Sequence, residues 1–444
     1  MSGPLPDRAL VVGAARSGIA AAAALAARGA EVVLHDRSAG LEVAAPAGVT
    51  LALGERDPAQ LVRPAEVLVK SPGVPDGAPV VAAARAAGLP VWSEVELGFR
   101  LLPAGARLVG VTGTNGKTTV AELAGAMLAE AGADVVVAGN VGVALSGVAA
   151  DVRPDAIVVC ELSSFQLEDV VTLRCAAAGL LNLTPDHLDR HGTMDEYGRC
   201  KLRMFERQRP GDTAVLNDDD PWVAALPGVP GNGRLVRTHG TEAERAGFAA
   251  GRLRGAHNRE NVAVAAALAR ALGADDAAVR RAVARFAPIP HRLEHVGDVG
   301  GVSLWNDSKA TNVDATLKAL TAFEGGSLRI ILGGSDKGAD FAPLAAALAG
   351  HVRSAYLIGP AGRRMAPLVQ AVVPAAVCDT LEAALDAALA DAEPGDAILL
   401  APACASFDEF TSYEARGDRF RELARARGAR PTSDPEPGTV DGIG

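Results

Sequence analysis

The chain has 444 residues, too many for one ordinary hydrophobic core, so we expect two or three domains. With 49% hydrophobic and 22% charged residues, no long apolar run and no secretory signal, the sequence argues against a membrane protein and favours a cytoplasmic globular one. The net charge of −10 argues against broad nucleic-acid binding, and five scattered cysteines exclude a disulfide framework or CxxC zinc site.

The first block of the chain repeats a strand–helix–strand pattern. In chain order we expect a strand at 9–13, an Ala-rich helix at 18–28, and strands at 31–36, within 66–73 and at 90–94, with a further helix near 79–87. Strands that alternate with helices predict a parallel sheet covered on both faces.

A second block begins near Arg107 with a strand, a Gly-rich turn and a helix. Further strands are expected at 134–138 and 156–160, and a helix near 259–271, whereas the Gly/Pro/Asn-rich segment 226–240 predicts a surface excursion. Residues 288–291 (PIPH) predict a hinge. A third block again alternates strand and helix, and the Pro/Gly-rich tail after it should be disordered.

The Gly-rich turn predicts a phosphate-binding loop. Glycines let backbone amides surround phosphate oxygens, and the helix N-terminus adds positive potential. Lys117, one of six lysines, would reach the β- and γ-phosphates, and Thr118 would offer a hydroxyl to Mg²⁺. The spacing departs from the usual Walker pattern, so a plain strand-to-helix turn is the alternative. The expected nucleotide contacts here are Gly113, Thr114, Asn115, Gly116, Lys117, Thr118 and Thr119.

The run GTNGKTT resembles the ATP loop of the Mur ligases and folylpolyglutamate synthases, which join a carboxylate to an amine through an acyl-phosphate. Further clusters along nearly the whole chain resemble the same family. With the three blocks, the resemblance implies three α/β domains, each with a mainly parallel sheet. We expect a Rossmann-like N-terminal domain at 1–104, a P-loop ATPase central domain at 105–290, a Rossmann-like C-terminal domain at 291–432, and a tail at 433–444.

The resemblance also implies a site for two Mg²⁺ ions. Glu161 follows an apolar strand and would be a metal ligand beside Thr118, and His187 would lie at the second ion. Lys201 resembles the lysine that the family carbamylates with CO₂; a neutral amine can undergo this reaction and a guanidinium cannot. The alternatives are a helix-capping carboxylate and a solvated lysine. His191 receives no role.

Residues 255–261 resemble the family's G-x-H-N-x-x-N, which implies that Asn258 and Asn261 contact adenine; an Asn/His helix cap is the alternative. Beyond the hinge, Arg292 and Asp307 would reach ATP. Lys309, in the run NDSKATN, would lie near the transferred phosphate and the incoming amino acid.

The two ends of the chain resemble the D-glutamate-adding members of the family. Near the N-terminus GxxxSG falls short of the dinucleotide fingerprint, so a dehydrogenase is a weak alternative. The expected UDP-substrate contacts are Gly13, Ser17, Gly18, Asp36, Arg37, Ser71, Gly73 and Asn140. The expected D-glutamate contacts are Lys309, Thr311, Lys337, Ser406, Phe407 and Tyr413, the last at a position that is often Phe in the family.

This resemblance implies a cytoplasmic, monomeric enzyme of peptidoglycan synthesis. It would join D-glutamate to UDP-N-acetylmuramoyl-L-alanine with ATP, two Mg²⁺ ions and a lysine carbamate, and would have no nucleic-acid or membrane partner. The expected catalytic residues are Lys117, Glu161, His187, Lys201 and Lys309. The alternatives are a catalytically silent Mur-like regulator, a Mur ligase for another amino acid, and a plain P-loop ATPase or kinase.

Overall fold

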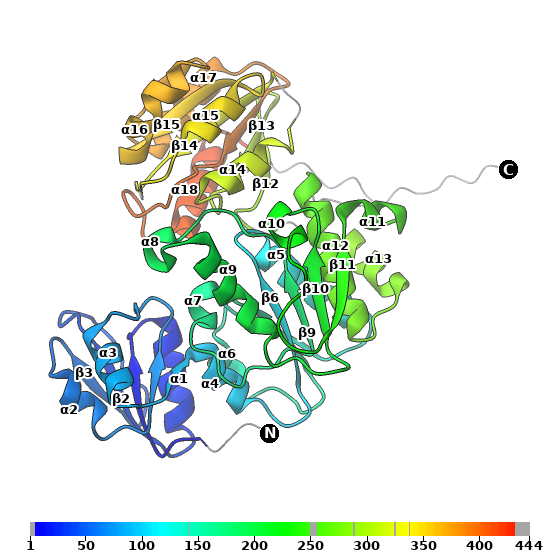
Figure 1. Ribbon diagram of the computed structural model, residues 1–444. Helices are drawn as coiled ribbons and strands as arrows, with labels where there is room; N and C mark the ends of the chain where they lie inside the picture. The colour runs from blue at the N-terminus through cyan, green and yellow to red at the C-terminus, as the bar shows by residue number, and fades with distance from the viewer. Residues whose placement is uncertain are drawn as a thin grey trace. The chain divides into compact units, whose positions relative to one another are not determined.

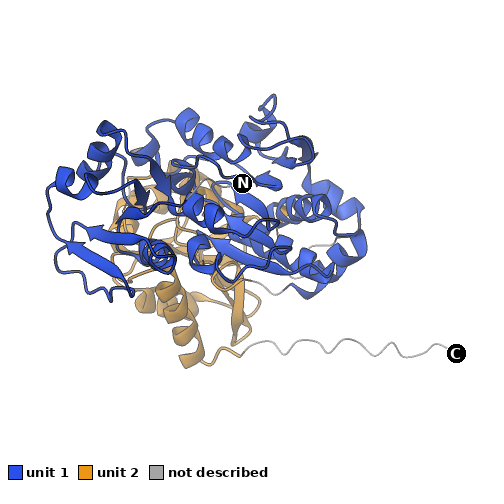
Figure 2. Ribbon diagram, turned by 90° about the horizontal axis from the view of Figure 1, so that it is seen from below, with its two compact units in different colours: residues 1–251, 257–286 blue, residues 252–256, 287–444 orange. Residues whose placement is uncertain are grey.

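The computed structural model describes residues 5–140, 142–248, 255–286, 289–323, 326–336 and 338–430. The chain divides into two compact units, one of residues 1–251 with 257–286 and the other of residues 252–256 with 287–444 (Figure 2). The first unit holds two parallel sheets, and the second holds one mainly parallel sheet (Figure 1). Within the described ranges, no helix is long and apolar enough to span a bilayer.

The N-terminal sheet has five parallel strands in the order β3-β2-β1-β4-β5. Their bounds are β1 Arg8–Val12, β2 Glu31–Asp36, β3 Val49–Leu53, β4 Val67–Lys70 and β5 Val91–Ser93. Alternate residues of β1 enter different cores. Val11 packs with α1 (Arg16–Ala26) and α4 (Glu94–Leu101), whereas Leu10 packs with α2 (Pro58–Val62) and α3 (Pro79–Ala86). Because β1 pairs with β4, the loops after these two strands meet at one edge of the sheet.

The central sheet has six parallel strands in the order β11-β10-β9-β6-β8-β7. Their bounds are β6 Arg107–Thr112, β7 Val135–Gly139, β8 Ile157–Glu161, β9 Ala177–Leu180, β10 Thr213–Asn217 and β11 Arg234–Thr238. The main helices are α5 (Lys117–Glu130), α12 (Ala256–Ala271) and α13 (Asp276–Arg285). Strand β6 lies between β9 and β8, so the loops after all three strands converge.

The prediction that the whole segment 226–240 is a surface excursion is wrong, because β11 extends the sheet from within it. The strand pairs with β10 at the sheet's edge, and its first two residues, Arg234 and Leu235, are exposed. An edge strand buries little apolar surface, so its sequence pattern is weak. Here the Gly and Pro residues just before it dominated the pattern.

The second unit holds a six-stranded sheet in the order β12-β13-β17-β14-β15-β16. Its strands are β12 Glu294–Val299, β13 Val302–Asn306, β14 Leu328–Gly333, β15 Val352–Ile358, β16 Ala375–Val377 and β17 Ala397–Leu400. Only the β12–β13 pair is antiparallel among these pairings. Ile330 and Ile331 enter separate cores, so both faces of this sheet are covered. Its helices are α14 Val313–Leu320, α15 Ala342–Leu348, α16 Gly359–Gln370, α17 Leu381–Asp391 and α18 Tyr413–Ala426.

Three α/β sheets, each mainly parallel, confirm the predicted fold class. The boundaries at 104/105 and 290/291 stay predictions, and the tail 433–444 lies outside the described residues.

Glu96 in α4 joins the N-terminal part of the first unit to the central part. Its side chain is fully buried, and its carboxylate accepts hydrogen bonds from the backbone amides of Val171, Thr172 and Leu173 at 2.9–3.0 Å. The Thr172 hydroxyl donates at 2.6 Å, and Arg100 donates from its own helix at 2.7 Å. One carboxylate therefore satisfies a whole turn of buried backbone.

Replacing Glu96 with alanine should lower the free energy of unfolding by about 3 kcal/mol, because the three amides would lose their acceptor and Arg100 its carboxylate. Glu244→Ala is a matched control, since that carboxylate pairs with Arg259 at the surface and its loss should cost less than about 1 kcal/mol. Urea unfolding of both variants measures the difference. Equal losses would contradict the bridging role of Glu96.

Candidate active site

The Gly-rich loop lies between β6 and α5. Gly116 caps the helix with φ 84°, and a Cβ added there would lie 2.6 Å from Asn261 Oδ1. Lys117 Nζ donates back to the carbonyl oxygens of Gly113 at 3.1 Å and Thr114 at 2.8 Å. The loop thus curls around an ammonium group at a helix N-terminus, an arrangement that suits phosphate.

Asn182 fixes the shape of this loop, and our sequence analysis gave it no role. Its Oδ1 accepts from the amides of Thr114 at 3.1 Å and Asn115 at 2.9 Å, and its Nδ2 donates to the Asn115 carbonyl at 3.1 Å. The Thr114 hydroxyl lies 3.3 Å from the Tyr197 hydroxyl. Position was the available signal, because Asn182 follows β9, the neighbour of β6.

A carboxylate at the C-terminal end of β8 lies beside a hydroxyl in the first turn of α5. Thr118 Oγ1 donates to Glu161 Oε2 at 2.6 Å, and Asn140 Nδ2 donates to Glu161 Oε1 at 3.0 Å. These oxygens are the ligand type that Mg²⁺ prefers, so the donor chemistry fits the expected ion. Asn140, expected at the UDP-linked substrate, also contacts the expected metal ligand, which brings the two predicted sets together.

Lys201, in α9 (Met194–Leu202), is 1% exposed, which excludes the solvated-lysine alternative. Its Nζ donates to the Gly113 carbonyl at 2.8 Å, the same oxygen that accepts from Lys117, and lies 4.5 Å from the ring centroid of Tyr197. Burial, together with the nearby Lys117 ammonium, lowers the pKa of Lys201 well below its ordinary 10.5. The structure therefore favours a neutral amine at this position.

Two histidines lie at the ends of the short helix α8 (Leu188–His191). His187 has φ 54° and a side chain 39% exposed, and its ring meets Phe165 edge-on at 4.8 Å between centroids. His191 is buried between the rings of Phe165 and Tyr197, at 5.4 and 5.0 Å, and its Nε2 lies 2.9 Å from Ser164 Oγ. His191 is thus a packing residue that connects the segment of His187 to Phe165 and to Tyr197 of α9, the helix that carries Lys201.

In the N-terminal part, Gly13, Gly18 and Ser71 pack tightly. Ser71 Oγ donates to the Gly13 carbonyl at 2.9 Å, and a Cβ at Gly18 would lie 1.8 Å from that oxygen. Ser17 lies in the first turn of α1, and Gly73 lies in the loop after β4.

Asp36, an expected UDP-substrate contact at the end of β2, accepts hydrogen bonds from two backbone amides. Despite partial burial, which opposes the effect, hydrogen bonds from the amides of Ser38 and Ala14 at 3.0 and 2.9 Å lower the pKa of this carboxyl group. Its carboxylate therefore shapes the loop after β1, and the exposed Arg37 follows it.

The second unit contains the expected amino-acid contacts. Lys309 Nζ lies 3.8 Å from the ring centroid of Tyr413, and Ser308 Oγ donates to the Tyr413 carbonyl at 2.8 Å. The buried Arg416, absent from our predictions, donates to the Ser308 carbonyl at 2.8 Å and the Ala405 carbonyl at 3.2 Å. It therefore ties the loop after β13 to the loop after β17.

The remaining expected residues of this unit occupy varied surroundings. Ser406 is buried, Phe407 is 70% exposed, and the Thr311 amide donates to the Lys309 carbonyl. Burial raises the pKa of Asp307 to about 7, against the opposing charge of Arg292. Lys337 lies outside the described residues, as does residue 288 of the expected hinge 288–291. In the first unit, Asn261 Nδ2 donates to Asn258 Oδ1 at 3.2 Å, and Thr119 is buried in the first turn of α5.

Comparisons with known proteins extend over nearly the whole chain. Residues 111–267 match the Mur ligase middle domain, and residues 291–404 match the Mur ligase, glutamate ligase domain. The UDP-N-acetylmuramoylalanine–D-glutamate ligase of Solibacter usitatus is 43% identical over 434 residues, covering 94% of this chain and 97% of the relative. The protein of the same name from Anaeromyxobacter dehalogenans is 41% identical over 451 residues, with 94% and 97% covered.

Solved structures show the same fold. The UDP-N-acetylmuramate–alanine ligase of Thermotoga maritima has a TM-score of 0.58 at 17% identity, covering 95% of this chain and 100% of its own. A pseudomurein peptide ligase type C from Methanothermus fervidus also has a TM-score of 0.58, at 18% identity, covering 94% and 99%.

The buried amine of Lys201 predicts a pH dependence of stability. Between its depressed native pKa and the ordinary 10.5, the unfolded chain binds a proton that the native protein does not, so native stability falls as pH falls through this window. In CO₂-free buffer, the free energy of unfolding of Lys201→Met should therefore rise relative to that of wild type as the pH is lowered. The rise should be up to about 1.4 kcal/mol for each pH unit.

Urea unfolding at about pH 9 and about pH 7 measures this gain. Lys318→Met, at a lysine paired with Asp314 within α14, controls for the loss of any amine. If the free energies of unfolding of Lys201→Met and wild type differ by the same amount at both pH values, Lys201 is charged in the native protein.

Proposed function

Because this chain belongs to the Mur ligase family, we propose that it joins D-glutamate to UDP-N-acetylmuramoyl-L-alanine with ATP, a step of peptidoglycan precursor synthesis. The observation that carries this proposal is the identity of 40–43% to D-glutamate ligases over at least 94% of the chain. The phosphate-type loop beside buried Glu161 and Lys201 supports the ATP-dependent chemistry. Such a buried arrangement would be unexpected in a catalytically silent regulator.

The reaction forms an amide in two transfers. The substrate carboxylate attacks the γ-phosphorus of ATP, which gives an acyl-phosphate and ADP; the D-glutamate amine then attacks the acyl carbon, phosphate leaves, and the amine loses a proton. The chain's contribution is positioning and charge stabilisation. Lys117 and the loop amides around Gly116 would hold the phosphates. Mg²⁺, held by Thr118 and Glu161 with His187 at a second ion, would neutralise phosphate charge.

The environment of Lys201 supports a carbamate at this position. A neutral amine can add CO₂, and the product carries a negative charge where a protonated lysine would be positive. Because Lys117 and Lys201 donate to the same Gly113 carbonyl, a carbamate would place a negative charge near the Lys117 ammonium, whereas a protonated Lys201 would repel it. The resulting carboxylate-like group would provide another oxygen ligand for Mg²⁺.

The substrates would be distributed over the ends of the chain. The UDP-linked substrate would be bound by Gly13, Ser17, Gly18, Asp36, Arg37, Ser71, Gly73 and Asn140, with Asp36 also holding the loop after β1. Asn258, Asn261, Arg292 and Asp307 would complete the ATP site, and the D-glutamate set would be Lys309, Thr311, Lys337, Ser406, Phe407 and Tyr413. The domain boundaries, a monomeric state and a cytoplasmic location belong to the same proposal.

Phosphate release from ATP in the presence of UDP-N-acetylmuramoyl-L-alanine tests the proposed function. D-glutamate, L-glutamate, L-alanine and meso-diaminopimelate are supplied in separate reactions. We expect turnover with D-glutamate alone, because the ends of the chain resemble D-glutamate-adding enzymes. Turnover with another amino acid instead would contradict the specificity, and no turnover despite ATP binding would contradict the activity.

A further inference from the structure

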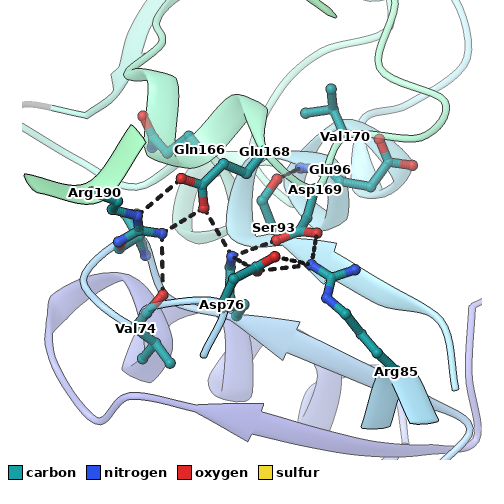
Figure 3. Close-up of polar contacts among 12 residues, drawn as sticks. Val74, Asp76, Arg85, Ser93, Glu96, Gln166, Glu168, Asp169, Val170 and Arg190 are labelled. Carbon is teal, nitrogen blue, oxygen red and sulfur yellow. Dashed lines mark hydrogen bonds and ion pairs between the residues drawn. The ribbon is translucent and has the colours of Figure 1, made fainter. Parts of the chain in front are cut away.

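An ionic cluster links the N-terminal and central parts of the first unit (Figure 3). Its members are the acids Asp76, Glu168 and Asp169 and the bases Lys70, Arg85 and Arg190. The three carboxylates have a spacing that could suit a metal ion, but Lys70 Nζ lies 2.7, 3.0 and 2.6 Å from them. The Lys70 side chain is fully buried, and three bases balance three acids. The charges of the cluster therefore balance, and it connects the two parts of the unit rather than forming a cation site.

Arg190 belongs to the central part of the unit and contacts the backbone of the N-terminal part. Its Nε and Nη2 donate to the two Glu168 carboxylate oxygens at 2.9 and 2.5 Å. Its Nη1 donates to the Pro72 carbonyl at 2.8 Å. Its Nη2 also donates to the Val74 carbonyl at 3.2 Å (Figure 3). The guanidinium stacks 4.3 Å from the Phe165 ring centroid. A planar fork suits this set of contacts, whereas a lysine could not make them all.

The two carbonyls belong to the turn that follows β4. The Val74 amide donates to the Ser71 carbonyl at 3.0 Å, which closes the turn. Ser71 is held at the start by its amide, which donates to Val12, and by its hydroxyl, which donates to Gly13. The sheet therefore fixes the beginning of the turn, and Arg190 fixes its far side. Gly73 lies between the two residues whose carbonyls accept hydrogen bonds from Arg190.

Phe165 connects Arg190 to the expected metal site. The Phe165 ring contacts the Arg190 guanidinium on one side and the His187 ring, 4.8 Å away, edge-on. His187 and Arg190 also lie three residues apart, at the start of and within α8. The turn of Ser71 and the segment of His187 are thus held against one another by one arginine and one aromatic ring.

We propose that Arg190 is a positioning residue that holds the Ser71–Val74 turn in the conformation that receives the UDP-linked substrate. This inference rests on the proposed function for the identity of the substrate. Because the cluster is neutral overall, Arg190 acts by fixing carbonyl positions rather than by attracting the diphosphate. Its loss should therefore weaken capture of the UDP-linked substrate and leave the binding of D-glutamate unchanged.

Steady-state kinetics of Arg190→Gln, Arg190→Lys and Arg203→Gln test the proposal. Arg203, in the turn after α9, donates to the carbonyls of Glu168 and Val170, so its variant controls for the loss of a nearby arginine that donates to a segment other than the Ser71–Val74 turn. We expect Arg190→Gln to raise the KM for UDP-N-acetylmuramoyl-L-alanine about 10-fold, while kcat and the KM values for ATP and D-glutamate stay within about 2-fold. Arg190→Lys should recover only part of this loss, and Arg203→Gln should resemble wild type.

Hydrogen–deuterium exchange gives a readout that does not depend on activity. In Arg190→Gln the amides of residues 71–78 should exchange faster, while those of residues 113–120 keep their wild-type rate. Unchanged exchange at 71–78, or an equal rise in KM for Arg203→Gln, would overturn the proposal. If wild-type protein makes no product with D-glutamate, the proposed function fails, and the exchange data still decide whether Arg190 holds the turn.

Discussion

The site depends on one crowded contact, where the amines of Lys117 and Lys201 donate to the same carbonyl oxygen of Gly113. Two positive charges cannot share such a buried position at low cost, so one amine must be neutral or be converted into an anion. Burial selects Lys201 for this role, because its side chain is enclosed by α9 and the loop. In the proposed ATP site, Lys117 would supply the positive charge that faces phosphate. Asn182 holds the loop in the shape that brings both lysines to the Gly113 carbonyl.

Parallel sheets bring the other groups to that contact. In the central sheet β8, β6 and β9 are neighbours, so their ends place Glu161, the loop of Gly113 and Asn182 together. In the N-terminal sheet, β1 and β4 carry Gly13 and Ser71 at one edge in the same way. The neutral ionic cluster then joins this edge to the segment of the central part that carries Arg190.

Sequence patterns were sufficient for the fold class, because alternating buried strands and helices are local features. The GKT run likewise placed Lys117 and Thr118 at the start of α5, and an apolar strand placed Glu161 at the end of β8, where Thr118 donates to it; their roles at ATP and Mg²⁺ stay predictions. Other residues depend on contacts between distant segments. Asn182 and Arg190 gained their roles from hydrogen-bond partners 22 to 118 residues away, and His191 from ring stacking, which no local pattern records. The weak edge strand β11 was missed for a related reason, since its partner strand defines it.

Carbon-13 NMR of the protein with ¹³C-bicarbonate tests most directly whether the site is built around a neutral amine at Lys201. The wild-type protein should show a carbamate resonance, and Lys201→Arg, whose guanidinium cannot add CO₂, should lack it. Loss of bicarbonate should remove the signal and activity together. Absence of a carbamate signal from active wild-type enzyme, or the same signal in Lys201→Arg, would contradict this account of the site.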